Sequence, residues 1–376
     1  MRIADFALER YFARWEFAVE HVLCGSDVEG WRMAELLALA DPEAAALWAD
    51  LRLGYTESTG HPLLRAEIAG LYDGLEADDV LVFAGAEEAV FCLFNTSLGP
   101  GDHVVVTWPG YQSLYEVARA AGADVSLHAL REEDGWALDV ERLRRSIRPT
   151  TRMVVVNAPH NPTGMLPSQA EWQALATMCA EAGIRLIADE VYRYLEVDPA
   201  DRLPAGADLG PASVSIGVLS KSFALAGLRI GWLATRDPAL LERCTRLKDY
   251  TTICSSAPSE ILGLIALRAR DQVLARSRDI VAANLALLDG FFERRADALT
   301  WVRPRGGSTA FPRLVPTGAA GRSAEAFCSA LVEKTGVLLL PSTTFGSGDG
   351  HVRLGFGRTD MPAAIEKLDA FLDAGG

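Results

Sequence analysis

The chain has 376 residues, of which 49% are hydrophobic and 23% are charged. This balance excludes wholesale disorder, and the length exceeds the size at which one hydrophobic core stops growing, so we expect two lobes. The formal net charge is 36 − 50 = −14. A nucleic-acid partner is therefore not expected, and a phosphorylated small ligand would need a local positive pocket.

The six cysteines are scattered, with no CxxC pair and no histidines nearby at metal-ligand spacing. They indicate reduced thiols that serve in packing, and no metal site is expected. The opening residues MRIADFALERYFARWEF carry charges throughout their apolar pattern, and the sequence has no apolar run of membrane length. We therefore predict a cytoplasmic protein without a signal peptide and without a membrane partner.

The opening segment, residues 1–45, indicates an amphipathic helix marked by Phe6, Tyr11 and Trp15. A loop at Cys24–Gly30 and a second short helix follow. We expect this segment to pack with the smaller lobe.

From Leu63 onward, short runs rich in Val, Ile and Leu alternate with helical stretches such as Leu114–Ala121 and Gln169–Ala182. This alternation is typical of parallel βαβ units. It predicts a large α/β domain over residues 46–270 with a mostly parallel seven-stranded sheet. The candidate strands are Val80–Ala84, His103–Thr107, Asp124–Leu127, Met153–Asn157, Arg185–Asp189, Val214–Leu219 and Ile230–Ala234.

The alternation stops near Pro258. Residues 259–295 contain almost no glycine and predict one long helix between the lobes. Beyond it, strand patterns at Ala310–Leu314, Gly336–Leu340 and His351–Gly355 are flanked by helical patterns. We therefore predict a smaller α+β domain over residues 271–376.

Unusual residues follow the predicted strands, and open α/β sheets bind ligands at the carboxyl ends of their strands. One edge of the sheet would display an aromatic ring, an amide, a carboxylate, a phenol and an amine. The segments that supply them are Gly85-Ala86-Glu87-Glu88, Pro109-Gly110-Tyr111, Pro159-His160-Asn161-Pro162-Thr163-Gly164, Asp189-Glu190-Val191-Tyr192 and Ser220-Lys221-Ser222.

Each of these segments also has an ordinary structural interpretation. Gly85-Ala86 is by itself most often a plain βα turn, Tyr111 more often packs than stacks, and the residues from Asn161 to Gly164 favour turns. Asp189 and Lys221 are harder to explain this way, because both adjoin buried apolar strands and a buried charge needs a partner. Attachment to an aldehyde would remove this cost at the lysine.

Taken together, NAPHNPTG, ADEVY, SKSFALAGLRIGW and HVRLGF resemble the motifs of class I/II aminotransferases, which depend on pyridoxal 5′-phosphate (PLP) and have the fold type I architecture. The intervals agree as well: 28 residues separate Asn161 from Asp189, 32 separate Asp189 from Lys221, and 8 separate Lys221 from Arg229. The resemblance extends from about Gly54 to Phe356 and is most specific around the lysine.

The resemblance implies roles at the cofactor ring. Lys221 would carry PLP as a Schiff base and act as the base that moves the α-proton, and Asp189 would keep the pyridine nitrogen protonated. Asn161 and Tyr192 would hydrogen-bond the phenolic oxygen of the ring. Tyr111 would stack on the ring face.

It also implies how phosphate and substrate are held. Arg229 and Ser220, with the backbone N–H groups of Ala86 and Glu87, would bind the phosphate. Arg353 would grip the substrate α-carboxylate through its planar fork, next to Asn161. Tyr55 matches a family tyrosine that reaches the phosphate site of the neighbouring subunit, so a homodimer is expected.

The sequence departs from the family pattern at two places. Val218 stands three residues before the lysine, where the family often has a hydroxyl residue. The glycine-rich segment that usually covers the substrate is replaced by LCGSDVEGWRM. The segments Asp249–Thr252 and Arg305–Phe311 are expected to border the side-chain pocket.

Three functions remain open at this point. The first is transamination between an L-amino acid and a 2-oxo acid. The second is β-elimination or cyclisation of a substituted amino acid, because the pocket-bordering segments also resemble those of capreomycidine synthase. The third is a non-catalytic PLP-binding sensor module, which the absence of a basic DNA-binding extension disfavours.

Overall fold

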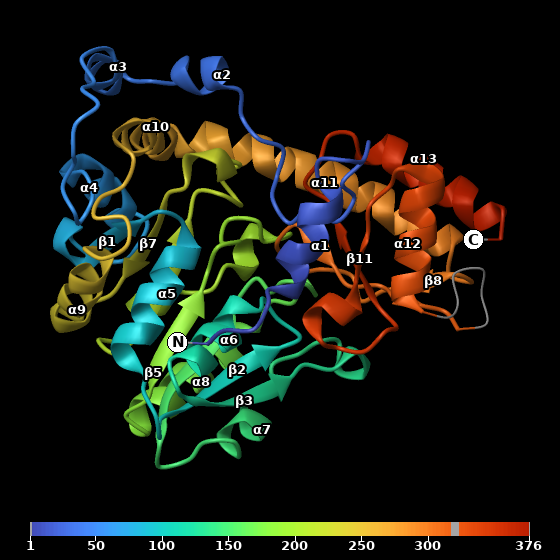
Figure 1. The fold of residues 1–376 in the computed structure, drawn as a ribbon, viewed down its shortest axis with the longest axis horizontal. Helices are drawn as coiled ribbons and strands as arrows, with labels where there is room; N and C mark the ends of the chain where they lie inside the picture. The colour runs from blue at the N-terminus through green and yellow to red at the C-terminus, as the bar shows by residue number, and fades with distance from the viewer. Residues whose placement is uncertain (1, 317–322, 376) are drawn as a thin grey trace.

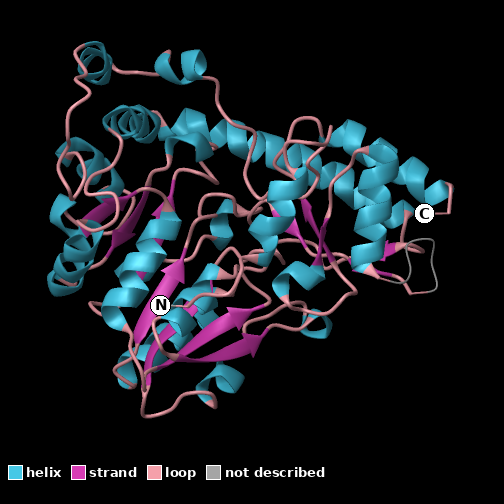
Figure 2. Cartoon of the chain, viewed as in Figure 1, coloured by secondary structure: helices cyan, strands magenta, loops and turns pink. Residues whose placement is uncertain are grey.

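A computed structural model describes residues 2–316 and 323–375. Its centre is a seven-stranded sheet in the order β1-β7-β6-β5-β4-β2-β3 (Figure 2). The pairs β3–β2, β2–β4, β4–β5 and β5–β6 are parallel, and β7 is antiparallel to both of its neighbours. The predicted mostly parallel sheet is therefore confirmed. The strands are β1 (Val80–Phe83), β2 (His103–Trp108), β3 (Asp124–Ala129), β4 (Thr151–Asn157), β5 (Arg185–Asp189), β6 (Val214–Val218) and β7 (Gly231–Ala234).

Helices cover both faces of this sheet because its strands are apolar on both sides. In β2, Val104 and Val106 pack into a cluster with α5, α6 and α9, whereas Val105 packs into a cluster with α7 and α8. At the β1–β7 end, α4 and α10 cover the sheet. The bounds are α4 (Pro62–Ala69), α5 (Ala86–Ser97), α6 (Ser113–Ala120), α7 (Val140–Arg144), α8 (Gln169–Glu181), α9 (Pro238–Lys248) and α10 (Ala257–Arg268).

The predicted long helix over residues 259–295 is wrong in one respect. It is two helices, α10 and α11 (Arg270–Arg294), which meet at Ala269. Neither glycine nor proline marks this break in the sequence. Arg268, the last residue of α10, instead bonds Asp41, Glu43 and Glu67 on distant segments. Contacts of this kind cannot be read from a local pattern.

The smaller lobe packs α11, α12 (Ala324–Thr335) and α13 (Met361–Asp373) around short strands (Figure 1). The predicted strand Ala310–Leu314 is divided at Pro312, which has no N–H group to donate. Of the strand predicted at residues 336–340, only Leu340 belongs to an observed strand. Gly336 instead has a left-handed φ of 71° and caps α12. The strands are β8 (Leu299–Thr300), β9 (Thr309–Ala310), β10 (Arg313–Leu314), β11 (Leu340–Pro341) and β12 (Val352–Gly355).

The opening segment contacts both parts of the molecule. It forms the predicted first helix, α1 (Ala7–Trp15), and two short helices, α2 (Met33–Leu37) and α3 (Pro42–Ala49). Leu23 and Val28 belong to the apolar cluster of the smaller lobe. The two short helices lie against α10 (Figure 1). The proposed boundaries after residues 45 and 270 stay predictions.

Within residues 2–316 and 323–375, no helix combines the length and the apolar character that crossing a membrane requires.

Candidate active site

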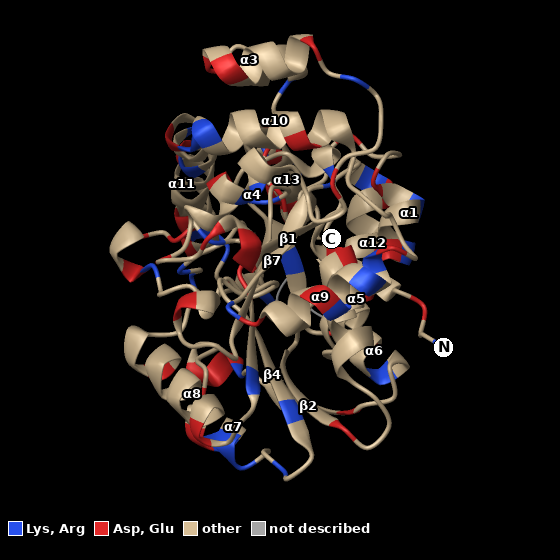
Figure 3. Ribbon diagram, turned by 90° about the vertical axis from the view of Figure 1, so that its left-hand side faces the viewer, with Lys and Arg blue, Asp and Glu red and all other residues tan. Residues whose placement is uncertain are grey.

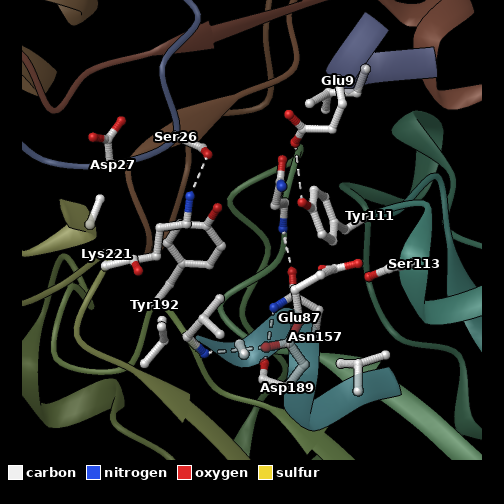
Figure 4. Close-up of a pocket in the computed structure, with 18 of the residues that line it drawn as sticks. Glu9, Ser26, Asp27, Glu87, Tyr111, Ser113, Asn157, Asp189, Tyr192 and Lys221 are labelled. Carbon is white, nitrogen blue, oxygen red and sulfur yellow. Dashed lines mark hydrogen bonds between the residues drawn. The ribbon is translucent and has the colours of Figure 1, made fainter. Parts of the chain in front are cut away.

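A cavity of about 350 Å³ lies where the carboxyl ends of the central strands meet α1 and the small-lobe strand β12 (Figure 4). It brings together ten of the predicted site residues, although they come from segments up to 267 positions apart (353 − 86). These residues are Ala86, Glu87, Tyr111, Asn161, Asp189, Tyr192, Ser220, Lys221, Arg229 and Arg353.

At one end of the cavity, a glycine turn opens the N-terminus of α5. Gly85 has a φ of 88°, a conformation that L-residues rarely adopt, and a Cβ atom there would lie 2.4 Å from Nη2 of Arg229. Arg229 Nη1 is also 3.4 Å from the Ser220 hydroxyl. A helix N-terminus, a guanidinium and a hydroxyl thus face one small space, and such donors suit a phosphate.

The floor of the cavity carries a buried carboxyl group. Asp189 ends β5 and is only 6% exposed, and the sheet register places it beside Asn157 of β4. Within the described part of the chain, its carboxylate accepts a single, long hydrogen bond, from the Val191 N–H at 3.4 Å. Burial raises the pKa of Asp189 to about 7, and the carboxylates of Glu190 and Glu87 add to this. Lys221 offsets only part of this rise, and among the described residues no cation forms an ion pair with Asp189.

The amine of Lys221 lies above this floor, near two polar side chains. It donates a hydrogen bond of 2.8 Å to Ser26 Oγ, and it lies 5.8 Å from the centre of the Tyr192 ring (Figure 4). The Tyr192 side chain is buried, which fixes the ring beside the amine. The lysine is thus held in the open cavity by neutral partners.

Arg353 is a buried cation whose bonds are all to neutral oxygens. It is 1% exposed, and its Nε and Nη2 donate to the Cys24 carbonyl at 3.1 and 2.8 Å. Its Nη1 donates to Asn161 Oδ1 at 3.3 Å. Among the described residues no carboxylate pairs with it, so an anionic ligand would satisfy a charge that the fold leaves open.

Tyr111 forms a wall of the cavity. Its ring packs at 5.1 Å from Phe6, and its hydroxyl donates to the Glu9 carboxylate at 3.4 Å. Glu87 lies close by, next to the Ser113 hydroxyl, and desolvation by the surrounding fold raises the pKa of this carboxyl to about 7. Both acidic side chains face the cavity in Figure 4.

Tyr55 is the predicted site residue that the fold does not bring to this cavity. It is 89% exposed. Thr56 donates to the Ser255 carbonyl at 3.4 Å, which places the segment beside the loop that carries Tyr250 and Ile253. Tyr250 is also 89% exposed, and Asp249–Thr252 is absent from the residues that line the cavity.

Several cavity residues were not predicted from the sequence. Asn157 accepts from the Asn161 N–H at 2.7 Å and donates to the Asp189 carbonyl at 2.9 Å, so it holds two predicted residues together. Asn157 is the first residue of the motif NAPHNPTG, four positions before Asn161. Its place in that motif is the sequence feature that could have identified it as a site residue. The other polar ones are Ser113 of α6 and four residues of the opening segment, Glu9, Glu16, Ser26 and Asp27. Ser26 and Asp27 lie in LCGSDVEGWRM, the segment that replaces the usual substrate cover, whereas no motif pointed to Glu9 or Glu16.

Comparison with known proteins agrees with this geometry. The chain is 34% identical to an arginine–pyruvate transaminase of Pseudomonas aeruginosa over 80% of this chain and 77% of that protein. It is 31% identical to capreomycidine synthase of Streptomyces vinaceus over 94% of this chain and 88% of the synthase. The crystal structure of a PLP-dependent aminotransferase from Streptococcus suis superposes with a TM-score of 0.92 at 31% identity, covering 100% of this chain and 99% of that one.

The fold and the cavity define a PLP-dependent transferase of fold type I. The model of the aminotransferase class I and II family matches residues 29–368, and the chain belongs to that family. It is a PLP-dependent aminotransferase, a class of enzyme that uses amino acids and 2-oxo acids as substrates. The predicted family, fold class and cofactor are thereby confirmed.

Proposed function

We propose that Lys221 carries PLP covalently and that this cavity exchanges an amino group between an L-amino acid and a 2-oxo acid. One observation carries the proposal: a single cavity contains the accessible amine of Lys221, the buried carboxyl group of Asp189 and the buried guanidinium of Arg353. Among the described residues, neither Asp189 nor Arg353 has an ion-pair partner of opposite charge. The protonated pyridine nitrogen of bound PLP would pair with Asp189, and the α-carboxylate of the amino acid would pair with Arg353.

The residues present fit the cofactor at each of its polar groups. The space against Gly85 would take the phosphate, held by Arg229, Ser220 and the N–H groups of Ala86 and Glu87. Val218 supplies no hydroxyl there, so the guanidinium and the helix N-terminus carry most of the binding.

The remaining residues would hold the ring. Asp189 would keep a proton on the pyridine nitrogen, which gives the buried carboxylate its counter-charge. Asn161 and Tyr192 would donate hydrogen bonds to the phenolic oxygen, and Tyr111 would stack on the ring face. When bound, PLP withdraws electrons from the α-carbon of the amino acid.

The protein's part in the reaction is then proton transfer and positioning. Arg353 would bind the α-carboxylate through two N–H groups and fix the orientation of the α-carbon. Once the amino group of the substrate has replaced it on the cofactor, the Lys221 amine would be free to accept the α-proton and to deliver it on the cofactor side of the substrate nitrogen. Ser26 would accept a hydrogen bond from this amine and help to hold it in place.

We propose in addition that the working unit is a homodimer. Four exposed apolar side chains on two adjoining segments support this: Leu53, Tyr55, Tyr250 and Ile253, here called the Tyr55 patch. In a two-fold pair, this patch of one subunit would lie against the cavity of the other, and Tyr55 would reach the partner's phosphate site. A cytoplasmic location stays a prediction from the sequence.

A second outcome is favoured by one comparison, the similarity to capreomycidine synthase over 94% of the chain. β-Elimination or cyclisation begins with the same α-proton loss and then depends on a leaving group in the substrate.

One experiment separates these outcomes. The PLP-loaded protein is mixed with single amino acids, and the absorption of the cofactor is followed together with ammonia and 2-oxo acid release. We expect conversion to the pyridoxamine form and a stoichiometric 2-oxo acid. Release of ammonia, or a cyclised product, with the PLP spectrum regenerated would replace transamination by the second outcome.

A further inference from the structure

The cavity contains more carboxylates than the proposed cofactor and α-carboxylate contacts use. Five line it, namely Glu9, Glu16, Asp27, Glu87 and Asp189, against the three cations Lys221, Arg229 and Arg353. All three cations have roles in the proposed function. Two carboxylates also have assigned partners: Asp189 faces the ring nitrogen, and Asp27 pairs with Arg358 at 3.0 Å through both oxygens.

Two of the remaining carboxylates stand on α1 and its C-cap, on the face turned to the cavity. Glu9 and Glu16 are seven residues apart, which is two helical turns or about 10 Å along the axis. Phe12 lies between them on the same face and also lines the cavity. Arg10 and Arg14 do not line it, although both signs of charge occur along this helix (Figure 3).

The carboxylates of Glu9 and Glu16 have few hydrogen-bond or ion-pair partners within the described part of the protein. In the part of the chain that the structure describes, the carboxylate of Glu16 has no hydrogen bond or ion pair, although its backbone N–H donates to the Phe12 carbonyl. Glu9 accepts one long hydrogen bond from Tyr111. Burial raises the pKa of Glu16, the neighbouring carboxylates of Asp27 and Glu9 raise it further, and the more weakly acting cations Arg358 and Lys221 offset only part of this rise.

Arg353 gives an independent reason to expect a charged ligand here. It is a buried guanidinium bonded only to neutral oxygens, so it points to a carboxylate on the ligand. The ligand thus meets a cation on β12 and free anions on α1. A molecule with a negative group at one end and a positive group at the other complements both.

We infer that the substrate of this site is an amino acid whose side chain ends in a positively charged group, a guanidinium or an ammonium, and that Glu9 and Glu16 receive it. This inference rests on the proposed function for the placement of the α-carboxylate. A guanidinium suits the carboxylates best, since its planar fork bonds carboxylate oxygens in pairs.

Binding is tested without turnover, using acids that lack the α-amino group. 5-Guanidinopentanoate and 5-ureidopentanoate have nearly the same shape and differ in charge. Calorimetry on the PLP-loaded enzyme should show the guanidino acid binding roughly tenfold more tightly, as one charged hydrogen bond in a partly wet site provides. In Glu9→Gln and Glu16→Gln the ratio should fall, and in the double variant it should approach one.

Glu20→Gln is the matched control. It removes one negative charge four residues beyond Glu16, outside the cavity, where the carboxylate pairs with Lys367 at 2.5 Å. This variant should keep the wild-type ratio. Circular dichroism and PLP absorbance check that each glutamine variant is folded and loaded. A wild-type ratio near one, or an undiminished ratio in the double variant, would overturn the inference.

Turnover separates this inference from the function on which it rests. L-Arginine should outcompete its neutral counterpart L-citrulline, and L-lysine should outcompete L-norleucine if an ammonium is also accepted. If the neutral amino acids are transaminated as well as the charged ones, the inference is wrong and the proposed function stands. If no amino acid converts the cofactor while the binding ratio holds, the proposed function is wrong and the cation site stands.

Discussion

Asp189 illustrates how a single buried side chain anticipates its ligand. The motif ADEVY placed it at the end of an apolar strand, and the structure leaves it 6% exposed, with no ion-pair partner among the residues it describes. Burial raises the pKa of this carboxyl group to about 7, from its ordinary value of 3.8. It therefore destabilises the cofactor-free protein, and the penalty grows as the pH rises from about 4 to 7 and then stays constant.

Asp189→Asn should accordingly stabilise the cofactor-free protein, by roughly 2–4 kcal/mol above pH 7 and by almost nothing near pH 4. The same change should reduce turnover of the loaded enzyme by orders of magnitude, because the ring nitrogen loses its counter-charge. Urea unfolding at pH 4 and pH 8, with and without PLP, measures the first effect. An equal change in stability at both pH values would show that Asp189 does not titrate as described.

At the scale of one element, the β1–α5 junction depends on a glycine for its shape. Gly85 and Gly101 flank the same helix, and both have positive φ, 88° and 93°. A Cβ on Gly85 would meet Arg229, whereas a Cβ on Gly101 would meet nothing within 4 Å. Alanine at either position would have to adopt a positive φ, which costs on the order of 1–3 kcal/mol.

The two alanine variants therefore separate strain from cofactor binding. Gly85→Ala should weaken PLP affinity roughly tenfold or more, because the new methyl group displaces the Arg229 guanidinium. Gly101→Ala should bind PLP like the wild type. Titration of the cofactor-free proteins with PLP measures both. Equal affinities in the two variants would remove Arg229 and the α5 N-terminus from the phosphate site.

The central sheet could be predicted from the sequence, and the smaller lobe could be predicted only in part. Runs such as MVVVN and IRLIAD are apolar on both faces, and all seven strands appear where these runs predict them. The break at Ala269 and the division of a strand at Pro312 depend on tertiary contacts and pairing partners. Local periodicity carries no information about either.

The active site likewise has one side that could be predicted from the sequence, formed by the strand ends, and one side that could be predicted only in small part, formed by the opening segment. Residues at strand ends were predictable, because parallel strands bring their carboxyl ends to one edge. Glu9, Glu16 and Ser26 come from the opening segment, which reaches the cavity through contacts such as His21 with Val337. For Ser26 the only signal was its place in LCGSDVEGWRM, and nothing in the sequence pattern indicated that Glu9 and Glu16 belong to a site.

At the scale of the whole molecule, the exposed Tyr55 patch predicts a composite site between two subunits. A Lys221→Ala chain and a Tyr55→Phe chain should each be impaired alone. On subunit exchange, mixed dimers would contain one site with both defects and one with neither, so activity should return. If Tyr55→Phe is clearly impaired, exchange is demonstrated and no activity returns, then Tyr55 serves its own subunit.

The central claim is that Lys221 carries the cofactor, and borohydride reduction of the PLP-loaded protein followed by peptide mapping tests it most directly. We expect one labelled peptide, the one that contains Lys221, and no label in Lys221→Ala. Lys248→Met is the matched control, because Lys248 is a buried lysine whose amine donates to the Ser58 carbonyl away from the cavity. This variant should keep the label. Label on any other lysine, or label retained in Lys221→Ala, would contradict the account.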